Sequence, residues 1–399
     1  MIRQLIDLSH PRSFGRGFPH EFFTRLRHEA PVWWHKPTAQ TPGGEGFWVV
    51  SRFADVVAVF RDPKTFSSEL GGTQIFDGKG QGYQLNQSDG ANHRRLRGLV
   101  NQGFTPRMIG RLEADLRQRT RDILDAVPVG EVFDFVPSVA RELPLQAICS
   151  ILGVPQSDRA ELSEIVDLAI TAGTGEVMAL EHVRRLSQHG RRLIEEKRRA
   201  PADDILSAIV HAKLEDGSPQ LDDRELRGFF DLLFPAGAET TRSAIAGTLL
   251  ALIENPQELD RLRADPSLMK TFVEEAVRWT TPSVYKRRTA ACDTELRGEG
   301  IRRGQKVTVW EMSANRDEDV FREPFRFDVG RDPNDHVGFG IGVHFCLGAN
   351  LARLELRIMF EELLTRFEGF ERAGELAWSN NNRLVGLLSF PVRAHARRG

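Results

Sequence analysis

Cysteine is scarce in this sequence: Cys149, Cys292 and Cys346 are the only three among 399 residues. They are isolated, so they form neither a disulfide framework nor the paired spacing of a structural zinc site. Long hydrophobic runs are missing too, and charged residues interrupt the first 31 positions, which predicts neither a signal peptide nor a transmembrane helix. We therefore expect a cytoplasmic protein without a membrane anchor.

A strong net charge is also absent, because 54 basic residues face 56 acidic ones. A balance of −2 gives no global field that would favour nucleic acid or an anionic membrane as a partner. Internal repeats and low-complexity segments are missing. The 40% of hydrophobic residues is ample for a sizeable core in one large domain or two smaller ones.

The segment from Phe339 to Gly348, FGIGVHFCLG, combines Cys346 with three glycines. Such a backbone must turn tightly or let a partner come very close. A helical pattern follows from Ala349 to Phe370, and a thiol at a helix N-terminus is expected to have a lowered pKa. From the residues alone, Cys346 could be a small buried side chain, a nucleophile, a redox thiol or a zinc ligand beside His344. The glycines favour a large flat partner.

A long helix is predicted from Asp222 to about Asn255, roughly 50 Å at 1.5 Å per residue. Its middle reads FPAGAETT, from Phe234 to Thr241. Pro235 removes a backbone donor, a glycine weakens the helix, and two threonines compete for carbonyls, so we expect a kink. This segment is either a bent core helix or one that carries an acid and hydroxyls for chemistry.

Two further helices carry paired polar residues. His93 and Arg97 share one face of a basic helix at Asn92–Asn101, and Glu275 and Arg278 share one face of a helix at Leu268–Trp279. Solvated surface pairs are the ordinary explanation of both. The glycine-rich stretch 71–90 is predicted to be a loop that is either mobile or functional.

The other expected elements are assigned from periodicity and turn residues. They are a helix at Pro19–Glu29, a hairpin of Val32–Trp34 and Phe47–Val50, a helix at Asp55–Phe60, successive helices over 111–200 with breaks near Pro128–Gly130, Gly153–Pro155 and Thr171–Gly175, a helix beginning at Asp203, short strands after Pro282, and an apolar hairpin at Leu384–Val392.

The order of Phe339, Gly342, His344, Cys346 and Gly348 resembles the haem-binding signature of the cytochrome P450 family. Ala-Gly-x-Glu-Thr-Thr in the long helix resembles the oxygen-activation motif of that family, and the resemblance runs from about residue 20 to the end. It implies a mainly α fold with small β-sheets: the cytochrome P450 fold, a helical prism with a long kinked central helix and a Cys-ligand loop. It also implies one domain over residues 1–399.

The resemblance further implies haem b as cofactor, with Cys346 as the axial ligand of the iron. The residues expected to bind the cofactor besides Cys346 are His93, Arg97, Arg288 and His344 at the propionates, with Phe339, Gly340 and Gly348 beside the ring. The catalytic residues are Glu239 and Thr240, which would relay protons, and Glu275, Arg278 and Arg331 have a structural role. The substrate pocket is expected at Phe76, Phe230, Phe234, Ala238, Val284 and Leu387. Two positions depart from the family pattern: Asp89-Gly90-Ala91 replaces Asp-Pro-Pro, and Pro235 is unusual.

The implied reaction is insertion of one atom of dioxygen into a C–H bond of a hydrophobic small molecule. No flavin or iron–sulfur signature is fused to the chain, so the electrons are expected from a separate ferredoxin or flavodoxin-type donor, docking at Arg94, Arg95, Arg353 and Arg357. The segments Glu275–Trp279, Ser313–Asp317 and Pro333–His336 are most similar to bacterial members that hydroxylate steroids, terpenoids or branched lipids. A peroxide-driven peroxygenase and a non-catalytic haem-thiolate sensor are the alternatives.

Overall fold

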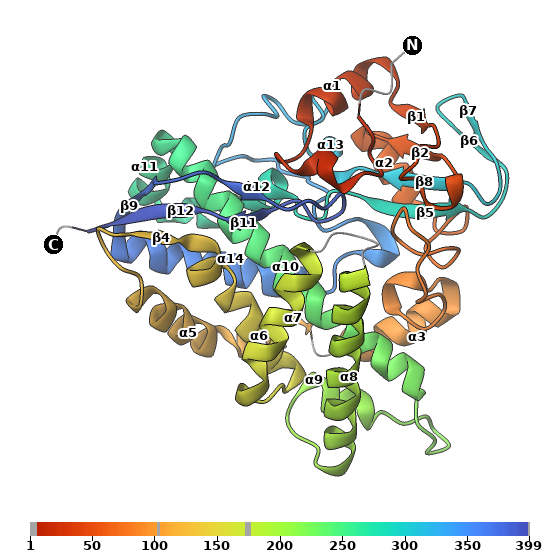
Figure 1. Cartoon of the computed structure of the whole chain (residues 1–399), viewed down its shortest axis with the longest axis horizontal. Helices are drawn as coiled ribbons and strands as arrows, with labels where there is room; N and C mark the ends of the chain where they lie inside the picture. The colour runs from red at the N-terminus through yellow and green to blue at the C-terminus, as the bar shows by residue number, and fades with distance from the viewer. Residues whose placement is uncertain (1–5, 102–103, 172–176, 398–399) are drawn as a thin grey trace.

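The computed structural model describes residues 6–101, 104–171 and 177–397. Helices fill most of it, and the strands gather in small sheets at two sides (Figure 1). The helices are α1 (His20–Glu29), α2 (Phe53–Arg61), α3 (Gly90–Asn101), α4 (Pro106–Gly110), α5 (Glu113–Asp125), α6 (Glu142–Leu152), α7 (Arg159–Thr171), α8 (Val177–Arg199), α9 (Ile205–Val210), α10 (Asp223–Glu254), α11 (Pro256–Ala264), α12 (Met269–Thr280), α13 (Glu311–Ala314) and α14 (Ala349–Arg366).

The strands are short. They are β1 (Val32–His35), β2 (Phe47–Val50), β3 (Phe66–Ser67), β4 (Val132–Asp134), β5 (Lys286–Ala290), β6 (Thr294–Leu296), β7 (Glu299–Ile301), β8 (Lys306–Val309), β9 (Phe367–Arg372), β10 (Ala377–Trp378), β11 (Leu387–Ser389) and β12 (Pro391–Ala396). The largest sheet has the order β1-β2-β8-β5-β3, and a second sheet has the order β4-β12-β9. The mainly α fold with small sheets that the resemblance implied is confirmed.

The central helix α10 begins where the sequence predicts. The Asp222 side chain accepts from the Glu225 N–H and the Glu225 side chain accepts from the Asp222 N–H, which closes a capping box at the N-terminus. The helix is continuous for 32 residues, and α6, α8, α12 and α14 pack around it (Figure 1). A Cβ at Gly237 would lie 3.0 Å from Ile148, so glycine here lets α6 approach closely.

The largest sheet places the strand that carries Arg288. β5 pairs antiparallel with β8, with Arg288 opposite Val307. Side chains alternate along a strand, so Lys286 and Arg288 share one face and Arg287 points to the other. On that other face Arg287 binds Asp77 of the 71–90 loop at 2.5 Å.

A buried ion-pair cluster fixes the segment that precedes the Cys346 loop. Glu275 and Arg278 are both fully buried, with Arg278 Nε 2.7 Å from Glu275 Oε2. Arg331 Nε and Asn334 Nδ2 also donate to Glu275 Oε2, each at 3.1 Å. The pair is therefore not a surface pair, and the Arg331 contact has the geometry expected of a structural triad.

Three predicted elements were wrong in part. The segment before residue 141 is not entirely helical, because Val132–Asp134 forms β4 and pairs with β12. The last helix ends at Arg366 instead of Phe370, since Phe367 opens β9 and pairs with β12. Leu384–Val392 is not a hairpin with itself: β11 pairs with β10, while β12 pairs with β4 and β9. In each case long-range strand pairing overrides a local apolar pattern.

The predicted break at Thr171–Gly175 lies largely outside the described residues. Within the described part of the chain, no helix combines the length and the apolar character needed to cross a membrane.

Candidate active site

Cys346 lies in the loop that enters α14. Its N–H donates to the Phe339 carbonyl at 2.9 Å and so closes the loop. Gly340 and Gly342 adopt φ values of 69° and 77°, a region that favours glycine. A Cβ at Gly342 would also lie 2.9 Å from the Phe60 carbonyl oxygen. The glycines are therefore required by the backbone path of this loop.

The Cys346 side chain is exposed to solvent, although many protein atoms lie around it. A Cβ added at Gly348 would meet nothing within 4 Å, so space is open on that side as well. Burial raises the pKa of the Cys346 thiol, outweighing a hydrogen bond from the Gly348 backbone and the charges of Lys286 and Arg97. The expectation of a lowered pKa was wrong for the chain alone, because enclosure outweighs the helix terminus.

Two histidines meet near this loop. The His93 and His344 ring centroids are 4.2 Å apart, although the residues are far apart in sequence. The Nε2 atom of His93 is buried with no hydrogen-bond partner among the described residues, and His344 Nε2 lies 3.5 Å from Asp89 Oδ1. Burial, with the charges of His344 and Arg97, lowers the pKa of His93 to about 4. The cluster therefore contains buried imidazole nitrogens that no described residue satisfies.

Arg97 and Arg288 bring positive charge to the same cluster. Arg288 is buried, and its guanidinium lies over the Phe60 ring at 5.2 Å and donates to the Arg287 carbonyl at 2.9 Å. Arg97 donates from Nε to Asn101 at 2.9 Å. Neither arginine forms an ion pair with any described residue, and burial lowers the pKa of Arg288 to about 10. Burying an arginine without an anion is unfavourable, so the cluster is suited to anionic groups.

These observations test whether the residues fit haem. The ring needs an open face at a thiol, and its two propionates need cationic partners. The accessible Cys346 thiol, the open space at Gly348 and the cluster of His93, Arg97, Arg288 and His344 supply these features. The residues present fit the cofactor.

The middle of α10, from Phe234 to Thr241, presents a hydroxyl on the accessible side of the helix, and the helix runs through Pro235 without a break. Thr240 Oγ1 donates to the Ala236 carbonyl at 3.0 Å, and Ala236 is exposed even though it lies in the middle of the central helix. Pro235 has no N–H, so the backbone bond it would make to the preceding turn is missing. The helix thus has a polar, accessible stretch at Ala236–Thr240.

Glu239 is buried beside this stretch and lies in a charge chain that reaches the surface. Burial raises the pKa of Glu239 to about 8, while nearby Arg242 acts in the opposite direction. Glu239 Oε2 is 3.4 Å from Arg242, which binds Asp167 at 2.8 Å, and Asp167 binds Arg141 at 2.7 Å. Sequence reasoning missed Arg242, Asp167 and Arg141. The spacing of three between Glu239 and Arg242 was the available signal.

Most of the predicted substrate-pocket residues are packed in the core. Phe230, Phe234 and Ala238 belong to the cluster between α6, α8 and α10, where a Cβ at Gly190 of α8 would touch Phe230. These three repeat every four residues, and at about 100° per residue they face away from Ala236 and Thr240. Their contact with a substrate stays a prediction. Val284 and Leu387 are also fully buried in core clusters, and only Phe76 is partly accessible.

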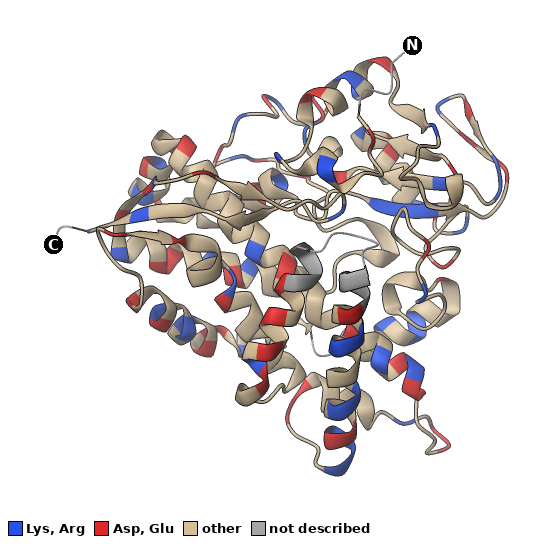
Figure 2. Cartoon of the chain, in the orientation of Figure 1, with Lys and Arg blue, Asp and Glu red and all other residues tan. Residues whose placement is uncertain are grey.

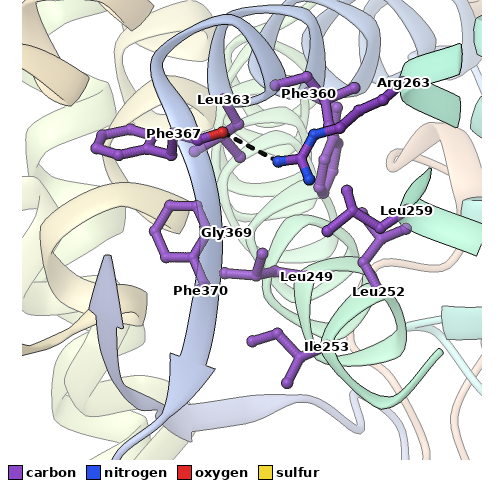
Figure 3. Close-up of a pocket in the computed structure, with 11 residues that line it drawn as sticks. Leu249, Leu252, Ile253, Leu259, Arg263, Phe360, Leu363, Phe367, Gly369 and Phe370 are labelled. Carbon is purple, nitrogen blue, oxygen red and sulfur yellow. Dashed lines mark hydrogen bonds between the residues drawn. The ribbon is translucent and has the colours of Figure 1, made fainter. Parts of the chain in front are cut away.

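One apolar pocket lies away from this site, between α10, α11, α14 and β9 (Figure 3). Its one charged residue, Arg263, donates to the Phe367 carbonyl at 3.0 Å. It is lined by Leu249, Leu252, Ile253, Leu259, Phe360, Leu363, Leu364, Phe367 and Phe370. With no acid, thiol or hydroxyl, it offers no chemistry and we regard it as a packing gap.

The expected docking arginines are largely neutralised. Arg95 binds Glu225, Arg353 binds Glu274 at 2.6 Å, and Arg357 binds Glu113 at 2.8 Å. Arg94 alone of the four is exposed with no ion pair to a described residue. Acidic and basic residues are interspersed along the helices (Figure 2). Carboxylates on neighbouring helices therefore pair with three of the four arginines, and docking of an electron donor at this surface stays a prediction.

The comparisons with known proteins agree on one family. The family model for cytochrome P450 matches residues 145–392. A Mycobacterium tuberculosis protein named cytochrome P450 126 is 50% identical over 400 residues, covering 97% of both chains. The methyl-branched lipid omega-hydroxylase of the same organism is 37% identical over 93% of this chain and 90% of its own. The steroid C26-monooxygenase of Rhodococcus jostii is 35% identical over 97% and 84%.

Solved structures extend the match to the whole fold. The Mycobacterium marinum cytochrome P450 CYP268A2, in complex with pseudoionone, superposes with a TM-score of 0.89 at 36% identity, covering 98% of this chain and 99% of that one. CYP108D1 of Novosphingobium aromaticivorans gives a TM-score of 0.87 at 34% identity, covering 98% and 97%. This chain therefore belongs to the cytochrome P450 family of haem-dependent monooxygenases.

Proposed function

We propose that this monooxygenase hydroxylates a hydrophobic, lipid- or steroid-like molecule with electrons from a separate ferredoxin or flavodoxin-type protein. Relatives named methyl-branched lipid omega-hydroxylase and steroid C26-monooxygenase support this substrate class. The observation that carries the proposal is Glu239: a buried carboxyl with its pKa raised to about 8, one residue from the Thr240 hydroxyl on the accessible stretch of α10.

The cofactor would be held by the Cys346 loop and by the cluster of histidines and arginines beside it. Cys346 would supply the thiolate, while His93, Arg97, Arg288 and His344 would bind the propionates. Phe339, Gly340 and Gly348 would flank the ring. When bound, haem supplies the activation of dioxygen and the transfer of one oxygen atom to the substrate.

The protein's own contribution would be proton delivery. Because its pKa is about 8, Glu239 carries a proton at neutral pH and can act as a general acid. The ion pairs of Arg242 and Asp167 with the partly exposed Arg141 form a polar path from Glu239 toward the surface, along which water could reprotonate the carboxyl. Thr240 donates to Ala236 in this state and keeps its oxygen lone pairs for an incoming proton donor.

Glu239 and Thr240 also bear on the two alternatives. A peroxide-driven peroxygenase receives its protons with the oxidant, and a haem-thiolate sensor transfers none. Neither would need a buried acid whose charge chain reaches the surface. The same residues are useful to a monooxygenase that must deliver protons during each turnover.

The test compares Thr240→Ala with Thr241→Ala, the neighbouring hydroxyl that is buried on another side of α10. With a surrogate ferredoxin and reductase, and with hexadecanoic acid and cholest-4-en-3-one as probes, product and oxygen consumption are measured. We expect Thr240→Ala to consume oxygen with little product, and Thr241→Ala to stay coupled. Peroxide-driven turnover that Thr240→Ala leaves unchanged, without electron-driven turnover in the wild type, would establish a peroxygenase. Absence of a thiolate-type carbon monoxide spectrum would refute the assignment of Cys346.

A further inference from the structure

Arg383 is a partly buried arginine that forms no ion pair with any described residue. Its backbone is fixed, because the N–H donates to Asn381 Oδ1 at 2.8 Å and the carbonyl accepts from the Val284 N–H at 3.0 Å. The side chain is partly buried, and its Nε is shielded from solvent without a hydrogen-bond partner. The guanidinium makes no hydrogen bond or ion pair with any residue in the described part of the chain. A buried guanidinium nitrogen in this state is unfavourable unless a further group completes it.

Arg383 lies between two parts of the candidate active site, the middle of α10 and the strand β5. The next residue, Leu384, lines a small pocket together with Glu239, Arg242 and Ser243 of α10. On the other side, Val284 leads directly into β5, which carries Lys286 and Arg288. Arg383 therefore lies between the proton-donating stretch of α10 and the strand beside the cofactor cluster.

The charges around Arg383 leave an excess of positive charge. Glu311 is the carboxylate that acts on it, but Lys286 Nζ already binds Glu311 Oε2 at 2.8 Å, and Arg288 acts on the same carboxylate. Tyr285 also faces Arg383, but burial raises its pKa to about 12, so it is a neutral phenol. Three cations thus act on Glu311, and of these only Arg288 also has a second carboxylate among the described residues, Asp89, acting on it.

The cofactor does not account for this excess. Its two propionates have four candidate partners in the cluster of His93, Arg97, Arg288 and His344. An arginine presents a planar fork of N–H donors that fits one carboxylate in a bidentate manner. The chain offers this fork at the inner end of an otherwise apolar segment, formed by Leu384, Val385 and Val284.

We propose that Arg383 binds the carboxylate of the substrate, so that this enzyme acts on apolar acids in preference to the corresponding neutral molecules. The inference rests on the proposed hydroxylase function and narrows its substrate class. Holding the carboxylate at Arg383 fixes one end of the substrate and so determines which carbon is presented to the reacting centre.

The experiment titrates purified ferric holoenzyme with dodecanoic and hexadecanoic acids and with 1-dodecanol and 1-hexadecanol, following the haem spin-state spectrum. We expect the wild type to bind each acid about tenfold more tightly than its alcohol, the size of a hydrogen bond to a charged group. Arg383→Met should lose that preference without weakening the alcohols, and Arg383→Lys should restore part of it. Arg303→Met, on an exposed loop, is the control. Equal wild-type affinity for acids and alcohols would overturn the proposal.

A haem propionate is the other possible source of the carboxylate, and the same proteins distinguish it. If Arg383→Met loses haem on gel filtration, or shifts the reduction potential of the ligand-free protein, while acid preference is unchanged, Arg383 serves the cofactor and the proposal is wrong. Failure of the hydroxylase function would be seen separately, as a missing thiolate-type carbon monoxide spectrum in the wild type. Because ligand binding is measured without turnover, acid selectivity is tested even if product formation fails.

Discussion

Two buried acid–arginine pairs with the same sequence spacing differ in how completely they are satisfied. Glu275 and Arg278 meet through two short contacts, 2.7 and 2.8 Å, and Glu275 also accepts from the Asp328 N–H, Arg331 and Asn334. Both carboxylate oxygens are fully used. A pair of this kind holds backbone segments together.

Glu239 and Arg242 make only one contact, at 3.4 Å, and Glu239 Oε1 is buried without a hydrogen-bond partner. The partner arginine is shared with Asp167. The pKa of Glu239 is accordingly raised to about 8, because burial is only partly offset. The spacing Glu-x-x-Arg therefore predicts only that the two side chains lie close together. The number of further hydrogen bonds to the carboxylate decides whether it has a structural role or can carry a proton.

The largest expected effect comes from breaking the satisfied pair. Glu275→Ala leaves the fully buried Arg278 without a counter-charge and should lower the free energy of unfolding by about 3–5 kcal/mol. Urea denaturation of the haem-bound protein measures it. Glu29→Ala, which removes the exposed partner of Arg25, should change stability by about 1 kcal/mol or less. Equal losses in the two variants would contradict a special role for the buried cluster.

The second effect comes from the unsatisfied pair. Glu239→Gln keeps the shape of the protonated acid, so stability at pH 7 should change little, while electron-driven product formation should fall about a hundredfold with loss of a general acid. Coupled product yield and urea denaturation are measured on the same preparations. Glu254→Gln, at the far end of α10, serves as the control. A variant that retains normal yield would remove Glu239 from the proton route.

The third effect is a pH dependence of stability. The folded state holds a proton on Glu239 up to about pH 8, whereas the unfolded chain releases it near its usual pKa of 4.5. The folded state therefore binds more protons in this window, and stability falls as pH rises through it, by up to about 1.4 kcal/mol per pH unit. The unfolding free energy of the wild type minus that of Glu239→Gln should decline between pH 5 and pH 8 and level off above. If the difference in unfolding free energy does not change with pH, the pKa of Glu239 is not raised in the folded protein.

The sequence predicts best what is set by local chemistry. The start and end of α10 follow from the capping residues around Asp222 and the loss of periodicity at Asn255, and the Cys346 loop follows from its glycines. Strands of two or three residues, such as β4, carry too little pattern to be assigned before their partner β12 is known.

The site was predictable where residues are neighbours in sequence and unpredictable where packing decides. Glu239 and Thr240 are adjacent, so the motif contains both. Which face of α10 is accessible depends on how α6 and α8 pack against Phe230 and Phe234, and no local sequence pattern encodes that packing. The link from Arg242 to Asp167 likewise depends on the docking of α7.

The smallest expected effect is on the rate of reduction by the electron donor, and it compares an unpaired surface arginine with a paired one. Arg94 is exposed and makes no ion pair to a described residue, while Arg353 is held by two contacts to Glu274, 2.6 and 2.8 Å. A paired charge contributes little to the field that an acidic electron donor meets. Arg94→Gln should therefore slow reduction by a surrogate ferredoxin about two- to fivefold at low salt, an effect that disappears when salt screens exposed charges. Arg353→Gln should slow reduction less, because the Arg353 charge is already paired with Glu274. After the substitution, His336 still contacts Glu274. Stopped-flow reduction rates over a salt series decide the matter: identical salt slopes for the wild type and both variants would mean that the donor docks elsewhere on the molecule.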